Sequence, residues 1–168
     1  FKKFKILNKY NTISIYDVNK WISERPEVIL VTDKVEDPIN FLDYFKFKNQ
    51  LIMELFDYES IIKAKELNLK YFVSDIFLYK NLPINRNLLE RLSTLGVKNI
   101  AASNIVINKD INFFIEAKED MKMNIYFYQI SENLKNMEKD QINFLCSYPN
   151  LLSGGYFETA DFENDIKC

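Results

Sequence analysis

An acidic and a basic residue follow directly on a short apolar run in the stretch "VILVTDKVEDP", residues 28–38. Residues 28–32 are aliphatic or β-branched and lead straight into Asp33 and Lys34. A carboxylate is a ligand for divalent cations, and a lysine ammonium acts as a point charge on phosphoryl oxygens. The pair therefore indicates a site that holds a metal ion and an anionic phosphate together.

A second carboxylate of interest is Glu54, which lies inside the apolar run "LIMELF" at residues 51–56. Burial of a carboxylate costs free energy unless a cation or a hydrogen-bond donor compensates it. We therefore assign Lys34 and Glu54 as candidate catalytic residues and Asp33 as the candidate metal ligand. The alternative for Glu54 is a structural role with a hydrogen-bonding partner.

Polar side chains also follow the other apolar runs. In parallel α/β folds, functional groups gather at the carboxyl ends of the strands, so these residues are expected to share one rim with Asp33. The alternative is that Asp33 and Asp57 cap helices, Asp75 and Asn104 bind loop backbone, and Lys34 faces solvent. The further rim candidates are Asp57, Asp75, Ser103, Asn104, Gln129, Ser131, Ser147 and Tyr148.

The elements that would position these residues alternate along the chain. Near-continuous apolar strands separated by single helices predict an α/β fold with a parallel sheet covered by helices, in one domain spanning residues 1–168. Gly154 and Gly155 look like a turn after the last strand. The predicted strands are 28–32, 51–56, 71–76, 97–101, 124–129 and 142–146. The predicted helices are 14–24, 57–68, 85–96, 109–120 and 131–141.

The sequence also indicates where several helices begin and end. Ser14 with Asp17 three residues later forms a capping pattern, and Asp57 precedes the apolar face of the next helix. Gly96 ends the helix of residues 85–96 as a left-handed stop.

Composition excludes several classes of function. The chain has no histidine, which removes the commonest general base and metal ligand, and its net charge of -2 argues against nucleic acid as a partner. The chain has neither the G-x-G-x-x-G motif of dinucleotide-binding folds nor the G-x-x-x-x-G-K-[ST] motif of P-loops. No apolar run is long enough to span a membrane. Cys146 and Cys168 match neither a disulfide framework nor a metal spacing, and no signal peptide is seen. We expect reduced cysteines in a cytoplasmic protein.

The order of segments resembles the later part of the glycerophosphodiester phosphodiesterase family of phosphatidylinositol-phospholipase-C-like barrels, especially its bacterial members. The resemblance is carried by "WISERPEVILVTD" and "LIMELFDYESIIKAKELNLKYFVSDIF", and by "MNIYFYQISENLKNMEKDQINFLCSYPNLL" as closing strand, helix and strand. Gln129 stands where the family has threonine, and Cys146 and Ser147 stand before Tyr148 and Pro149 in place of threonine and aspartate.

The resemblance implies a TIM (β/α)8-type barrel, of which about six strands are present here, a divalent metal (Ca²⁺ or Mg²⁺) and cleavage of a small-molecule phosphodiester. Asp33 matches the acidic metal-binding position on the family's third strand. The family lysine lies two residues after that acid, at the position of Val35 here, so Lys34 is one place out of register. The two family histidines belong to the first part of the barrel, which has no match in this chain.

Three interpretations remain open. In the first, the chain is the later part of a phosphodiesterase-like barrel whose missing segment lies elsewhere. In the second, it is a barrel scaffold without catalytic groups that binds a phosphorylated ligand or a protein partner. In the third, it is an open α/β sheet that acts as an acidic binding module, such as an inhibitor or immunity-type protein. We favour the first.

Overall fold

The computed structural model describes residues 5–6, 10–35, 37–130 and 137–156. Within these residues, six parallel strands form one sheet, in the same order in space as along the chain. The sheet curls into a half-barrel, which confirms the predicted α/β class. Two short strands, β1 (Lys5–Ile6) and β2 (Tyr10–Asn11), form a separate antiparallel pair. The strands of the main sheet are β3 (Leu30–Thr32), β4 (Leu51–Leu55), β5 (Lys70–Ser74), β6 (Asn99–Ser103), β7 (Asn124–Tyr128) and β8 (Leu152–Tyr156).

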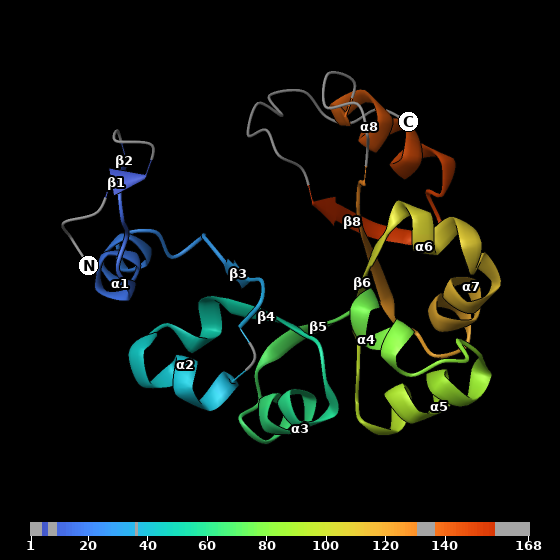
Figure 1. Cartoon of the computed structure of the whole chain (residues 1–168), viewed down its shortest axis with the longest axis horizontal. Coiled ribbons are helices and arrows are strands. Elements are labelled where there is room, and N and C mark those ends of the chain that lie inside the picture. Colours follow the sequence, from blue (N-terminus) through green and yellow to red (C-terminus); the bar gives the residue numbers. More distant parts are fainter. Residues whose placement is uncertain (1–4, 7–9, 36, 131–136, 157–168) are drawn as a thin grey trace.

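Helices connect consecutive strands and cover the outer face of the sheet. Figure 1 shows α2, α3, α5 and α7 following one another along the outside of the arc, with β3 and β8 toward its two ends. Because every crossover places its helix on the same side, the inner face of the described sheet carries no helix layer. The helices are α1 (Ile15–Ser23), α2 (Pro38–Tyr44), α3 (Tyr58–Glu66), α4 (Asp75–Lys80), α5 (Arg86–Thr94), α6 (Asn104–Lys109), α7 (Ile111–Glu119) and α8 (Met137–Ser147), with a 3-10 turn at Lys48–Gln50.

The helix ends predicted at Ser14, Asp57 and Gly96 are confirmed, whereas the predicted helix of residues 131–141 ends inside α8. Ser14 and Asp17 form a complete capping box, and the Asp57 carboxylate accepts a hydrogen bond from the Ser60 N–H at 2.8 Å. Gly96 follows α5 with a φ of 82°. Asn68 and Lys122 take the same left-handed conformation after α3 and α7, with φ of 51° and 56°.

Side chains alternate between the two faces of each strand. On β4, Met53 and Leu55 are fully buried and belong to the core beneath the helices. Glu54 lies between them and therefore points to the inner face of the half-barrel, as does Phe72, its partner in register on β5. The strands thus fill the core on one side and present a candidate site on the other.

One predicted strand is wrong. Residues 142–146 belong to α8. Gln141, Phe144 and Leu145 of this helix and Tyr148 directly after it recur at the three- and four-residue spacing of a helix face. Gln141 is buried, and the other three pack against the core. Cys146 is disulfide-bonded, so the expectation of a reduced thiol is wrong for this residue.

The paired glycines are not a turn but the middle of the closing strand. Gly154 and Gly155 lie in register with Tyr126 and Phe127 of β7. A Cβ on Gly155 would lie 2.3 Å from the Phe127 ring, and one on Gly154 would lie 3.2 Å from the Tyr126 ring. Glycine is therefore needed here because aromatic rings of the neighbouring strand fill the space.

Across the described ranges, no helix combines the length and the apolar character needed to cross a lipid bilayer.

Candidate functional site

The three candidate residues Asp33, Lys34 and Glu54 line one pocket. It lies at the carboxyl ends of the strands, on the inner face of the half-barrel, and has a volume of about 340 Å³. We call it the rim pocket. Its lining residues are Asp33, Lys34, Glu54, Phe56, Ser74, Ile76, Tyr128 and Tyr156.

Asp33 and Lys34 form an ion pair at the mouth of the rim pocket. Their side chains are 58% and 78% exposed, so the pair contributes little to stability. The hydrogen bond and the charge of Asp33 raise the pKa of Lys34, which stays a cation. Asp33 does not cap α2, because Asp37 does so through the N–H groups of Ile39 and Asn40.

Lys34 has an unusual backbone. Its φ is 61°, in the left-handed region that residues with a Cβ adopt at a cost. The other described non-glycine residues with positive φ, Asn68 and Lys122, follow helices, whereas Lys34 follows strand β3. Such outliers are concentrated at functional sites.

Glu54 is buried, with 9% of its surface exposed, and its carboxyl group is hydrogen-bonded to the Ser74 side chain. Burial raises its pKa above the ordinary value, and the nearby carboxylates of Asp33 and Asp75 raise it further. The Ser74 bond and the charge of Lys34 act in the opposite direction but are outweighed. Glu54 therefore holds its proton to a higher pH than a solvated glutamate and is suited to act as a general acid.

Tyr128 is anchored by Asp75, which is 3% exposed at the start of α4. The Tyr128 hydroxyl donates to both Asp75 carboxylate oxygens, and the Ser103 N–H donates to one of them at 2.9 Å. Burial, together with the hydrogen bond and charge of Asp75, raises the pKa of Tyr128. Asp75 thus binds the backbone of strand β6, not that of a loop as the structural alternative had it, and also fixes one wall of the rim pocket.

Tyr156 forms another wall and was missed by sequence reasoning. It is the last residue of β8, a strand that the sequence placed ten residues too early because of the apolar run in α8. Its ring meets Phe72 edge-on at 6.3 Å and Tyr128 at 6.4 Å between centroids. The signal that would have found it is the strand pattern around the paired glycines.

The other rim candidates have local structural roles. Asp57 caps α3, Ser103 caps α6, and the Asn104 side chain accepts a hydrogen bond from the Ile130 N–H at 2.9 Å. Gln129 follows β7 but does not line the rim pocket. Ser131 lies outside the described residues.

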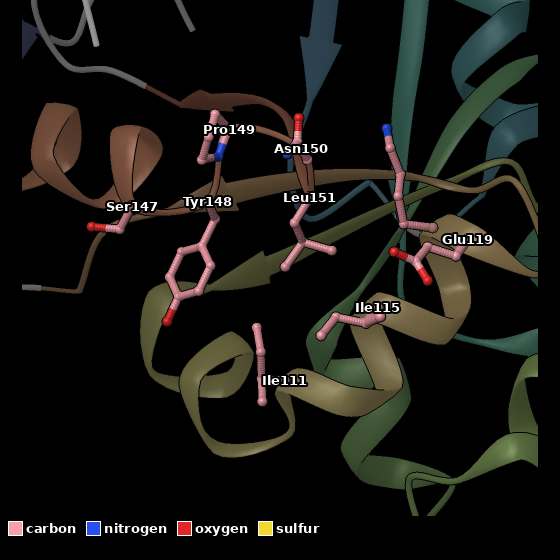
Figure 2. Close-up of a pocket in the computed structure, with 9 residues that line it drawn as sticks. Ile111, Ile115, Glu119, Ser147, Tyr148, Pro149, Asn150 and Leu151 are labelled. Carbon is pink, nitrogen blue, oxygen red and sulfur yellow. The ribbon is translucent and has the colours of Figure 1, made fainter.

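Ser147 and Tyr148 do not belong to the rim. Ser147 ends α8 and Tyr148 follows it. Both precede β8, so they lie at the amino ends of the strands, opposite to their predicted position. There they line a different cavity of about 260 Å³ against α7. Figure 2 shows Tyr148 and Leu151 above Ile111 and Ile115, and the Tyr148 hydroxyl donates to the Asn108 side chain at 2.9 Å.

The ligands that the rim pocket offers can be compared with those that Ca²⁺ and Mg²⁺ require. Among the described residues, no group of three histidine, cysteine, aspartate or glutamate side chains is placed to hold a metal. Ca²⁺ takes six to eight oxygen ligands, whereas Mg²⁺ is commonly held by one or two carboxylates with water and a substrate phosphate. Asp33, which lines the pocket, could act as a single carboxylate ligand of this second arrangement, whereas Glu54, which holds its proton, is a poor ligand.

No protein-family model, curated protein or solved structure matches this chain. The α/β half-barrel is therefore established by the structure alone. What the chain does is inferred from the rim pocket.

Proposed function

We propose that this chain is a phosphodiester hydrolase-like domain, similar to the glycerophosphodiester phosphodiesterases, and that the rim pocket binds a small-molecule phosphodiester with a divalent metal. The observation that carries the proposal is the meeting of Asp33, Lys34 and Glu54 in one pocket at the carboxyl ends of parallel strands. Active sites of β/α barrels lie at this end.

Each of the three residues has a distinct proposed role. Asp33 is exposed at the pocket mouth and would hold Mg²⁺ through its carboxylate. Lys34 would contribute positive charge to the phosphoryl oxygens, and Glu54 would give its proton to the leaving alcohol oxygen. A bound Mg²⁺ supplies Lewis-acid polarisation of the phosphoryl group.

Hydrolysis by the family's route needs groups from outside this chain, because the chain has no histidine. The sheet also has fewer strands than the eight of a closed β/α barrel: β3 and β8 each pair on one side only within the described residues. A further barrel segment would close the gap between them and bring to the rim the base that activates water, while Glu54 would remain the acid.

Replacement of Asp33 by Asn tests the metal side of the proposal. We expect Asp33→Asn to weaken Mg²⁺ binding about tenfold in titration calorimetry, because a neutral amide replaces a carboxylate ligand. Asp43→Asn is the matched control, since Asp43 is exposed on α2 and does not line the rim pocket. Equal Mg²⁺ affinities of Asp33→Asn and the wild type would refute the role of Asp33.

A second function is favoured by the absence of histidine and of a three-ligand metal group in the described part of the chain. In this alternative, the half-barrel is a binding module without catalysis, and the rim holds a phosphorylated ligand or a protein partner. A stable 1:1 complex with a partner protein, together with a melting temperature that Mg²⁺ does not change, would favour it over the hydrolase.

A further inference from the structure

The rim pocket has a polar side and an apolar side. Asp33, Lys34 and Glu54, to which the proposed function gives the metal, the phosphate and the proton, lie where β3 and β4 end. Apart from Ser74, the other lining side chains are aromatic or aliphatic: Phe56, Ile76, Tyr128 and Tyr156. A phosphodiester whose phosphate lies at Lys34 would therefore place an alcohol group against these apolar side chains.

Ile76 is the accessible part of the apolar side. It is the second residue of α4, two positions after β5 ends, and 45% of its surface is exposed. Ile76 does not belong to the hydrophobic core that the described residues form, and neither does the nearly buried Phe56. Contact between Ile76 and an apolar ligand would thus remove from water a surface that the fold itself leaves exposed.

The two tyrosines of the rim pocket offer their rings rather than their hydroxyl groups. The Tyr128 hydroxyl donates to Asp75 and is also hydrogen-bonded to the Ser103 side chain. The Tyr156 hydroxyl oxygen is inaccessible to solvent, although the residue as a whole is half-buried. A ligand in the pocket would therefore meet the Tyr156 ring and not its oxygen.

Ser74 is also committed to the protein. It is 1% exposed, its side chain is hydrogen-bonded to Glu54, and its oxygen accepts a hydrogen bond from the Ile76 N–H at 3.4 Å. A hydroxyl group on the ligand's alcohol would thus find no free side-chain partner among the described residues on this side of the pocket. Removal of such a hydroxyl from water without a new hydrogen bond costs free energy.

We propose that the rim pocket selects phosphodiesters of alkyl alcohols over phosphodiesters of polyols such as glycerol, and that Ile76 provides this specificity. The inference rests on the proposed function and names the alcohol side of its substrate. It departs from the glycerol diesters after which the resembling family is named. The phosphate would lie at Lys34, and one alkyl chain would lie on Ile76 and Phe56.

Two diesters with the same carbon skeleton test the specificity. Dipropyl phosphate and glycerophosphoglycerol carry the same charge and differ in the hydroxyl groups of the glycerols. Titration calorimetry in the presence of Mg²⁺ measures both affinities. We expect the wild type to bind dipropyl phosphate about tenfold more tightly, because a propyl chain gains free energy on burial whereas a glycerol loses hydrogen bonds to water.

Ile76→Asn tests the assigned residue. We expect this variant to bind dipropyl phosphate about fivefold more weakly than the wild type. Its affinity for dimethyl phosphate should be unchanged, since that diester has the same phosphate but no chain to place on Ile76. Because Ile76 is exposed and outside the core, the melting temperature should fall by less than about 2 °C.

Ile105→Asn is the matched control. Ile105 is the second residue of α6, directly after β6, and is 53% exposed, but it does not line the rim pocket. The Ile105→Asn variant should bind all three diesters like the wild type. Equal weakening of dipropyl phosphate binding in the two variants would refute a specific role for Ile76.

The remaining outcomes separate this specificity from the proposed function. Wild-type protein that binds glycerophosphoglycerol as tightly as dipropyl phosphate would refute the alkyl specificity and leave the phosphodiester site in place. A full preference for dipropyl phosphate in Ile76→Asn would refute the assignment of Ile76. Wild-type protein that binds none of the three diesters would refute both the specificity and the proposed function.

Discussion

The Tyr128 hydroxyl lies 2.8 Å and 2.9 Å from the two carboxylate oxygens of Asp75. Through this contact the end of β7 is tied to the start of α4, across β6, whose Ser103 N–H shares the same carboxylate. The Tyr128 hydroxyl, whose single proton lies between the two oxygens, and the Ser103 N–H together satisfy a buried carboxyl group that would otherwise be costly. They also hold one wall of the rim pocket in place.

Loss of the Tyr128 hydroxyl should destabilise the fold. We expect Tyr128→Phe to lower the free energy of unfolding by about 1–3 kcal/mol, because the buried Asp75 carboxylate keeps only its bond to Ser103. Urea unfolding followed by circular dichroism measures the change. The exposed Tyr44→Phe should change the same quantity by less than about 0.5 kcal/mol. Equal unfolding midpoints for the two variants would contradict this account of Asp75.

Glu54→Gln should stabilise the protein at neutral pH. Because the pKa of Glu54 is raised in the folded state above its ordinary value of 4.5, the folded protein binds this proton more tightly than the unfolded chain. The contribution of Glu54 to stability therefore falls as the pH rises from about 4.5 through the raised pKa. Glutamine does not titrate. The difference between the free energies of unfolding of Glu54→Gln and the wild type should therefore increase as the pH rises over this range.

The difference in free energy of unfolding between Glu54→Gln and the wild type should rise with pH and be largest at pH 8. Urea unfolding of both proteins at half-unit pH steps from 4 to 8 gives the difference directly. A difference that stays constant with pH would show that Glu54 has the same pKa in the folded and unfolded states.

Gly155→Ala should be markedly more harmful than Gly154→Ala. The added methyl of Gly155→Ala would lie 2.3 Å from the ring of Phe127, which is fully buried and cannot move without disturbing the core. We expect a loss of about 1–3 kcal/mol from this overpacking. At Gly154 the nearest ring atom is 3.2 Å away and belongs to the half-buried Tyr126, so the loss should be smaller. Thermal unfolding of the two variants compares them, and the reverse order would disprove the assigned packing.

Lys34→Gly should separate stability from ligand binding. Glycine adopts positive φ without strain, so Lys34→Gly should raise the melting temperature by roughly 2 °C while weakening the binding of dimethyl phosphate. Lys122→Gly is the matched control, because Lys122 has a similar φ of 56° but follows α7 and does not line the rim pocket. Lys122→Gly should raise the melting temperature without weakening the binding of dimethyl phosphate. Loss of binding in both variants would argue against a specific role for Lys34.

The alternation of strands and helices was predictable because each unit carries its own local signals. Ser14, Asp57 and Gly96 mark helix ends through their own hydrogen-bonding and conformational preferences, and these do not depend on distant contacts. The rim position of Asp33 and Lys34 followed from the parallel sheet, which brings the carboxyl ends of its strands to one edge. Glu54 was noticed for a different reason, as a carboxylate inside an apolar run.

The last helix and strand, α8 and β8, were not predictable in the same way, because the strand conformation of β8 depends on contacts with its neighbour β7. The glycines of β8 resemble a turn in the sequence, and only the rings of Tyr126 and Phe127 explain why they form a strand. Tyr156 was missed for this reason, as its position follows from that strand. The left-handed backbone of Lys34 also has no sequence signal, because lysine is not a residue that favours it.

The strand order β3-β4-β5-β6-β7-β8, identical to the order along the chain, has a consequence for folding. Each unit docks on the one made just before it, so the domain resembles a linear array of repeats with nearest-neighbour coupling. Each strand pairing nevertheless joins residues separated by a whole helical connection, such as Val73 and Ile100, and parallel pairing of this kind is slow to form. Growth during synthesis can proceed one unit at a time, with β8 added last against the rings that β7 has already placed.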